Sequence, residues 1–189
     1  YCAPKSRFGL FGSLYFVGVV LGAFIFPRLS DIYGRRKVGM FGNLFHIIPC
    51  FVFLSTDSLP LAFPMMFLIG LGMSSRCFVG YCWMTENMRE IDVAKSTSFM
   101  FYFDSLVLFN SSLYFMYISK DWRYLYGIPL CFFVINHAIY VCQDEPPKFL
   151  HGLGKYDEAR ALLTKIGRTN GVLKKDEHFT YKFIEESKD

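Results

Sequence analysis

A short charged turn, Asp31-Ile32-Tyr33-Gly34-Arg35-Arg36-Lys37, separates two long runs of uncharged residues. The first run covers residues 8–27 and the second covers residues 38–54. An α-helix needs about 20 apolar residues to cross the hydrocarbon core of a bilayer, which is about 30 Å thick. The turn therefore predicts two membrane helices joined by a charged loop, as in a polytopic membrane protein.

Five segments approach the length of a membrane helix, and most charged residues lie in the turns between them or in the C-terminal tail. The predicted spans are residues 8–29, 38–54, 59–84, 97–118 and 125–142. They are too long for strands and lack the polar–apolar alternation of β-barrel spans. Helices are favoured because they satisfy every backbone polar group internally. An all-α membrane protein is predicted, and the 53% apolar content agrees with it.

The basic residues indicate which side of the membrane each loop faces. The turn at residues 31–37 contains three Lys or Arg residues, and Arg28 lies at its edge, whereas the loop at residues 55–60 contains none. Because short cytoplasmic loops carry an excess of these residues, we expect the charged turn to be cytoplasmic. The net charge of +4 does not indicate nucleic-acid binding, since the basic residues are not interleaved with aromatic ones.

The six cysteines show no metal-ligand spacing, and five of them lie in predicted spans, where a thiol behaves as a small hydrophobe. Cys2 differs, because we expect it on the oxidising side of the membrane, where disulfides persist. After Cys142, Pro146-Pro147 cannot continue a helix. Residues 155–166 have an amphipathic helical period, and Gly167 is the predicted stop of that helix.

The charged turn resembles the signature loop between the second and third transmembrane helices of the major facilitator superfamily, whose pattern is G-x-x-x-D-x-x-G-R-R/K. The chain keeps four characteristic positions of this pattern, which are Asp31, Gly34, Arg35 and Arg36. Pro27 stands where the first glycine is usual, and Ile32 replaces the usual basic residue. We expect Gly34 to allow a tight reversal, the arginines to hold the turn in the cytosol, and Asp31 to meet a neighbouring helix N-terminus.

Four further segments resemble family features in the same order along the chain. Thr85-Glu86 is similar to the acidic end of helix four, and Asp121-Trp122-Arg123 is similar to the turn that enters helix six. The segment at residues 145–150 resembles the P-E-S-P-R-W-L sequence after helix six, and residues 154–159 resemble the cytoplasmic helix that follows.

The resemblance implies the superfamily's helical bundle, with five transmembrane helices of a twelve-helix fold and a cytoplasmic amphipathic helix. Residues 1–142 would hold helices two to six of the N-terminal half, and residues 143–189 would begin the central cytoplasmic loop. Helix one and the C-terminal half would lie outside this chain, so we expect the chain alone not to transport.

Two details favour the organic-ion transporters within the superfamily. Cys2 and Gly18 have the spacing of a cysteine and a glycine in that branch, and residues 166–171 resemble its Ile-Ala-x-x-Asn-Gly sequence. A sugar porter is the alternative, although the helix-four arginine of sugar porters falls at Met66. A membrane sensor that binds a solute without transporting it is an alternative of another class.

The resemblance implies transport of a small organic solute by alternating access, with H⁺ or Na⁺ as a candidate coupling ion, and we expect the solute to be an organic ion. The plasma membrane is the expected location. No nucleotide-binding loop or catalytic constellation is recognisable, so we predict neither an enzyme nor a cofactor nor a bound metal.

Arg76 and Asp104 are the formally charged residues well inside predicted spans. Arg76 lies ten residues before Glu86, and Asp104 lies nine residues after Lys95. At about 1.5 Å per residue, both would lie about 15 Å from the cytoplasmic helix ends. They are candidates for a static ion pair or for substrate or proton coupling, since an unpaired charge at that depth is costly.

Two further polar contacts are predicted. By resemblance, Arg35 and Glu86 form a latch that is made in one transport state and broken in the other, and the alternative is two solvated surface charges. The isolated His46 and His137 are expected to be hydrogen-bonded packing residues rather than proton relays.

Overall fold

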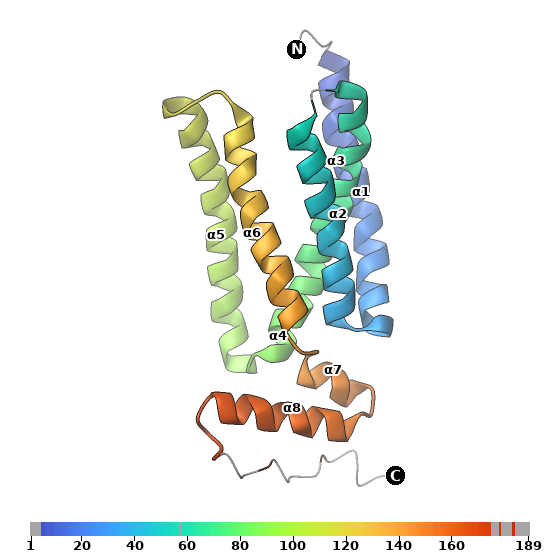
Figure 1. Ribbon diagram of the computed structural model, residues 1–189, viewed down its shortest axis with the longest axis vertical. Coiled ribbons are helices and arrows are strands. Elements are labelled where there is room, and N and C mark those ends of the chain that lie inside the picture. Colours follow the sequence, from blue (N-terminus) through green and yellow to red (C-terminus); the bar gives the residue numbers. More distant parts are fainter. Residues whose placement is uncertain (1–4, 57, 175–177, 179–182, 184–189) are drawn as a thin grey trace. The chain divides into compact units, whose positions relative to one another are not determined.

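A computed structural model describes residues 5–56, 58–174, 178 and 183. The chain divides into two compact units, Tyr1–Gln143 and Asp144–Asp189. All regular elements within the described residues are helices, so the predicted all-α class is confirmed (Figure 1).

The described residues of the first unit form six helices and one π-helical segment. They are α1 (Lys5–Tyr33), α2 (Arg35–Ser55), α3 (Leu59–Ser74), the π-helical segment η1 (Ser75–Val79), α4 (Gly80–Asn87), α5 (Glu90–Tyr117) and α6 (Trp122–Cys142). α3, η1 and α4 follow one another without a break and make one span, Leu59–Asn87. Each predicted span therefore corresponds to a helix, and most ends extend beyond the prediction.

Among the residues that the structure describes, four helical segments are long and apolar enough to cross a membrane. They are Gly9–Tyr33, Arg35–Ser55, Leu59–Asn87 and Trp122–Cys142. α5 has 28 residues and would be about 42 Å long, which is sufficient length. It is not one of these four segments, and it carries a charged first turn and polar residues such as Asp104 and Asn110. The fifth membrane span therefore stays a prediction.

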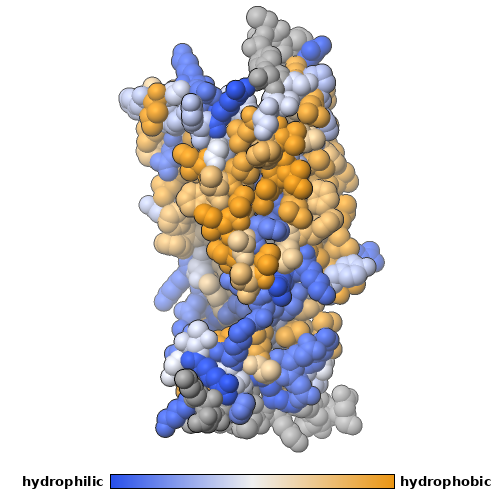
Figure 2. All heavy atoms as spheres, viewed as in Figure 1, coloured by the Kyte–Doolittle hydropathy of each residue, from blue (hydrophilic) through white to orange (hydrophobic). Residues whose placement is uncertain are grey.

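Apolar side chains cover the outside of this unit. Phe24, Leu108 and Tyr117 are each about three-quarters exposed, whereas the buried core around Phe26 and Val79 is small. Figure 2 shows apolar residues over the middle of these helices and hydrophilic residues towards their ends. This is the distribution expected of helices whose outer faces contact lipid.

Glycines allow the backbones of α1 and α3 to come into direct contact. A Cβ atom on Gly18 would lie 2.2 Å from the carbonyl oxygen of Phe67, and one on Gly70 would lie 2.1 Å from that of Tyr15. A Cβ on Gly22 would also lie within 2.7 Å of a side chain of α3. Gly18 and Gly22 lie four residues apart on α1, and small residues at this spacing permit close packing of membrane helices.

A hydrogen bond also joins α3 to α1, and a further glycine brings α2 close to α3. Ser74 Oγ donates to the Val19 carbonyl oxygen over 2.6 Å. A Cβ on Gly42 would lie 1.8 Å from Ser75 Oγ, so α2 also lies close to the α3–η1 junction. α6 packs against α2, whereas α5 makes no extensive contact with another helix in the part of the chain that the structure describes.

The second unit contains α7 (Pro147–Gly152) and α8 (Tyr156–Thr169). α8 corresponds to the predicted amphipathic helix, and Asp157 and Glu158 lie in its first turn, where the helix dipole favours acidic residues. The predicted stop at Gly167 is wrong, because Gly167 lies inside α8. The chain reverses at Gly171, which has φ +70°, and Val172 N donates to the Gly167 carbonyl oxygen over 2.9 Å.

Replacing Gly18 by alanine is expected to lower the free energy of unfolding by about 1–3 kcal/mol, since the added methyl group meets the backbone of α3. Gly12→Ala is the matched control on the same helix, because nothing lies within 4 Å of a Cβ there. Unfolding of the full-length protein in detergent measures both variants. Equal losses of stability in the two would contradict the close contact between α1 and α3.

Candidate functional site

Gly34 is the single residue between α1 and α2. Its φ of 105° lies in the region that favours glycine, so a side chain at this position would be strained. Gly34 N donates to the Ser30 carbonyl oxygen over 3.2 Å, and Val38 N donates to the Gly34 carbonyl oxygen over 3.4 Å. The predicted tight reversal at Gly34 is therefore present.

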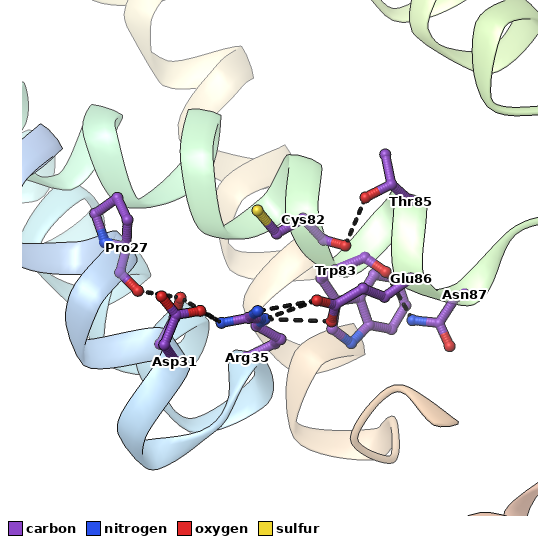
Figure 3. A network of polar contacts seen from close by, with 9 residues as sticks. Pro27, Asp31, Arg35, Cys82, Trp83, Thr85, Glu86 and Asn87 are labelled. Carbon is purple, nitrogen blue, oxygen red and sulfur yellow. Dashed lines mark hydrogen bonds and ion pairs between the residues drawn. The ribbon is translucent and has the colours of Figure 1, made fainter. Parts of the chain in front are cut away.

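Arg35 connects three helices through its guanidinium group. Nη2 donates to Glu86 Oε1 over 2.9 Å, and Nε lies 3.2 Å from both carboxylate oxygens of Glu86. Nη1 donates to Ser30 Oγ over 3.0 Å and to the Asp31 carboxylate. Figure 3 shows the Arg35 side chain between Asp31 and Glu86. The structure thus brings Arg35 of α2 together with α1 and α4.

The two carboxylates that Arg35 contacts differ in their exposure. The Arg35 and Glu86 side chains are 11% and 20% exposed, whereas the Asp31 side chain is 66% exposed. Charge-assisted hydrogen bonds are stronger where water screens them less, so the Glu86 contact is the stronger one. Arg35 and Glu86 are therefore not two solvated surface charges. Whether they act as a latch stays a prediction.

Asp31 does not contact a helix N-terminus in the way the sequence suggested. In the described part of the chain, its carboxylate pairs with the Arg35 side chain, four residues further on, instead of with backbone N–H groups. The neighbouring Ser30 is buried, and its Oγ donates to the Pro27 carbonyl oxygen over 2.8 Å. The last turn of α1 is thereby held against the start of α2.

Arg36 contacts the C-terminal end of α6, the last helix of the first unit. Its Nε donates to the Tyr140 carbonyl oxygen over 3.2 Å, and its Nη2 donates to the Val141 carbonyl oxygen over 2.5 Å. These carbonyls belong to the last turn of α6, where the helix itself offers no N–H partner and a cation is favourable. The sequence had assigned Arg36 only to holding the turn in the cytosol. This additional role was missed because the partners are backbone atoms more than 100 residues away.

The Tyr140 side chain reinforces this end of α6. A Cβ atom on Gly39 would lie 2.7 Å from Tyr140 Cε1, so the ring fits against the backbone of α2. The ring centroids of Tyr140 and Trp83 lie 5.8 Å apart. Arg36 and Tyr140 together hold the end of α6 beside the ends of α2 and α4.

Arg76 and Asp104 do not form the ion pair considered from the sequence. Arg76 lies in η1, and its Cζ atom lies 4.1 Å from the centroid of the Phe133 ring of α6. Asp104 is exposed on α5, and neither residue has an ion-pair partner among the described residues. The physical reason is that α5 makes no extensive contact with the helices that hold Arg76.

His46 packs as predicted, since it is buried and its Nδ1 lies 3.3 Å from the Ile69 carbonyl oxygen. Its ring meets the Phe133 ring edge-on at a centroid distance of 4.5 Å. For His137 the expected hydrogen bond is not seen at Nδ1, which is buried without a partner in the described ranges. Cys2 lies outside the described residues, and no group of three His, Cys, Asp or Glu side chains within them could hold a metal ion.

Comparison with protein families matches residues 1–181 to the Major Facilitator Superfamily. The chain is 27% identical over 177 residues to organic cation/carnitine transporter 2 of Homo sapiens, covering 91% of this chain and 31% of that protein. It is 27% identical over 180 residues to organic cation/carnitine transporter 4 of Arabidopsis thaliana, covering 90% and 32%. The chain thus spans about a third of the length of these relatives.

Two other proteins extend the comparison. The chloramphenicol resistance protein CraA of Acinetobacter baumannii is 36% identical over 98 residues, covering 52% of this chain and 22% of that protein. The fold is similar to that of the xylose transporter XylE from E. coli in a partially occluded inward-open conformation, with a TM-score of 0.70 and 18% identity. That match covers 85% of this chain and 43% of XylE, and it shows the fold alone.

Removing the Arg36 guanidinium is expected to loosen the end of α6. In Arg36→Met, the amides of residues 142 and 143 should exchange with solvent about tenfold faster, as expected for the loss of hydrogen bonds worth about 1.5 kcal/mol. Lys37→Met removes the same charge from the adjacent, exposed position and should leave the exchange unchanged. Hydrogen exchange of the full-length protein, read by mass spectrometry, measures this. Equal exchange in the two variants would show that the α6 contact carries no stability.

Proposed function

Because the chain belongs to the major facilitator superfamily, we propose that the protein containing it carries a small organic solute across a membrane by alternating access. The protein is an integral, multi-pass membrane protein. We further propose the plasma membrane as its location and an organic ion as its solute. The relatives described by name as organic cation/carnitine transporters, which align along 90% or more of this chain, support this solute class.

The observation that carries the mechanism is the half-buried contact between Arg35 and Glu86. A charge-assisted contact of this kind contributes about 1.5–3 kcal/mol. A difference of that size changes a two-state population by about 10- to 100-fold. The contact is therefore strong enough to bias one conformation and weak enough for bound solute to reverse it.

The position of the contact also fits a gate. Arg35 and Glu86 lie at the ends of α2 and α4, and Arg36 holds the end of α6 at the same side. We propose that this side is cytoplasmic, as the distribution of basic residues favours. Asp31, Gly34, Arg35, Arg36 and Glu86 then form one gating network that closes the cytoplasmic end.

The residues of the membrane interior are candidates for the solute site and for coupling. Arg76 and Asp104 are both without an ion-pair partner in the described part of the chain, and charges inside membranes commonly serve substrate or proton pathways. Coupling to H⁺ or Na⁺ would act through such groups, and a dependence of uptake on a proton or sodium gradient would identify the ion.

Uptake by the full-length protein reconstituted in liposomes tests the function. We expect saturable uptake of labelled tetraethylammonium or labelled hippurate and none of labelled glucose. Saturable glucose uptake alone would instead assign a sugar porter. Specific binding of these solutes without flux into the liposomes would assign a sensor. Either of the last two results would overturn the proposed transport of organic ions.

Distances between spin labels at the exposed positions 37 and 87 test the gate, in full-length protein with its native cysteines replaced. If the Arg35–Glu86 contact is a latch, saturating solute should shift the distance distribution, and Glu86→Gln should shift it in the same direction without solute. Asp31→Asn is the matched control and should shift it less, because its exposed contact contributes under about 1 kcal/mol. If neither solute nor Glu86→Gln changes the distance distribution, the Arg35–Glu86 contact is a constant structural contact and the proposed latch is wrong.

A further inference from the structure

Arg76 lies at an unusual position in the helix that carries it. The span Leu59–Asn87 is α-helical except for the five residues Ser75–Val79, which form the π-helical segment η1. π-helical insertions inside α-helices are rare and frequently lie at functional sites. The irregular turn thus coincides with the single formal charge in the interior of this span.

The guanidinium of Arg76 is held in place by an aromatic stack. Its Cζ atom lies 4.1 Å from the centroid of Phe133, and the edge-on contact between Phe133 and His46 supports that ring. His46 is only 6% exposed and is hydrogen-bonded to the Ile69 carbonyl oxygen. The stack spans η1, α6, α2 and α3, so the position of Arg76 is fixed before any solute binds.

This arrangement leaves the hydrogen-bonding edge of Arg76 unused. The Phe133 ring lies 4.1 Å from Arg76 Cζ and offers no oxygen acceptor, so it does not satisfy the five N–H donors of the guanidinium. Within the described residues, no carboxylate or carbonyl oxygen accepts from Arg76, and the side chain is only half-buried. A preorganised cation with free donors inside a membrane protein is a ready site for an anion.

We propose that Arg76 binds a carboxylate group of the solute and so makes the protein selective for organic ions that carry one. This inference rests on the proposed transport function and names the solute class. The guanidinium fork matches the two oxygens of a carboxylate, and Phe133 keeps the fork turned for that contact. A neutral analogue of the same shape leaves these donors unpaired and binds more weakly.

Asp104 offers the competing explanation. It carries the opposite charge within α5, although the two residues form no ion pair in this structure. A pair formed in another transport state would make Arg76 a structural residue. The two roles can be distinguished by substituting Arg76. Only a direct contact with the solute makes the effect of the substitution depend on whether the solute carries a carboxylate.

Competition with benzoate and benzamide separates these roles, because the two compounds have the same shape and differ in the carboxylate. The full-length protein in liposomes takes up labelled hippurate, which carries a carboxylate, and each unlabelled compound is added as an inhibitor. We expect benzoate to inhibit wild type at a concentration at least tenfold lower than benzamide. Arg76→Gln should bring this ratio close to one, with benzamide inhibition unchanged.

Lys95→Gln removes a positive charge at an exposed position of α5 outside the proposed site, so it is the control and should keep the wild-type ratio. Arg76→Lys, which keeps the charge but not the planar fork, should keep an intermediate ratio and serves if Arg76→Gln does not fold. Equal inhibition by the two compounds in wild type would overturn the proposal, as would a ratio that survives Arg76→Gln. A loss of the ratio in Asp104→Asn that is restored in the double variant would assign the ion pair instead. Uptake of labelled tetraethylammonium without uptake of hippurate would overturn the carboxylate proposal and leave the proposed function standing. Uptake of neither labelled ion would contradict the proposed function itself.

Discussion

The close approach of helix backbones at glycine positions is the constraint on which the rest of this structure depends. Helices in lipid gain no hydrophobic energy by associating, so they rely on tight packing and hydrogen bonds. Gly18 and Gly70 bring α1 and α3 together, and Gly42 brings α2 to the α3–η1 junction. This packing leaves α2 and the α3–α4 span in fixed register. The charged ends of these helices then meet, and so do the polar groups within them.

The Arg35 contact and the Arg76 stack are two consequences of this packing at different depths. At the helix ends, Arg35 meets Glu86 where partial exposure keeps the desolvation cost of the charges low. Deeper in the span, Arg76 meets an aromatic ring instead of a carboxylate. The first contact has both charges compensated, which suits a gate. The second leaves a charge available, which suits a binding site.

The sequence predicted the fold well because its signals were local. The apolar runs gave the helices, and the charged turn with Gly34 gave the reversal between α1 and α2. The Arg35–Glu86 contact was predicted only by family resemblance, since nothing local joins residues 51 positions apart. The contacts of Arg36 with α6 and of Phe133 with Arg76 were missed because they depend on helix register. The prediction that the helix ends at Gly167 was wrong because a glycine inside a helix cannot be told from a terminal one by sequence alone. In the structure Gly167 lies inside α8, and the Leu173 side chain packs against it.

The structure differs from the sequence-based expectation at Arg76, because no carboxylate among the described residues forms an ion pair with it. Two opposite charges at similar depth in consecutive spans suggest an ion pair, because burying either alone is costly. Pairing also requires the two helices to pack, and α5 makes no extensive contact within the described part of the chain. The guanidinium is instead stabilised by the electrons of the Phe133 ring, which offset part of the cost without occupying its donors. A cation held in this way stays able to bind an anion, whereas a cation in a closed ion pair would have to break that pair first.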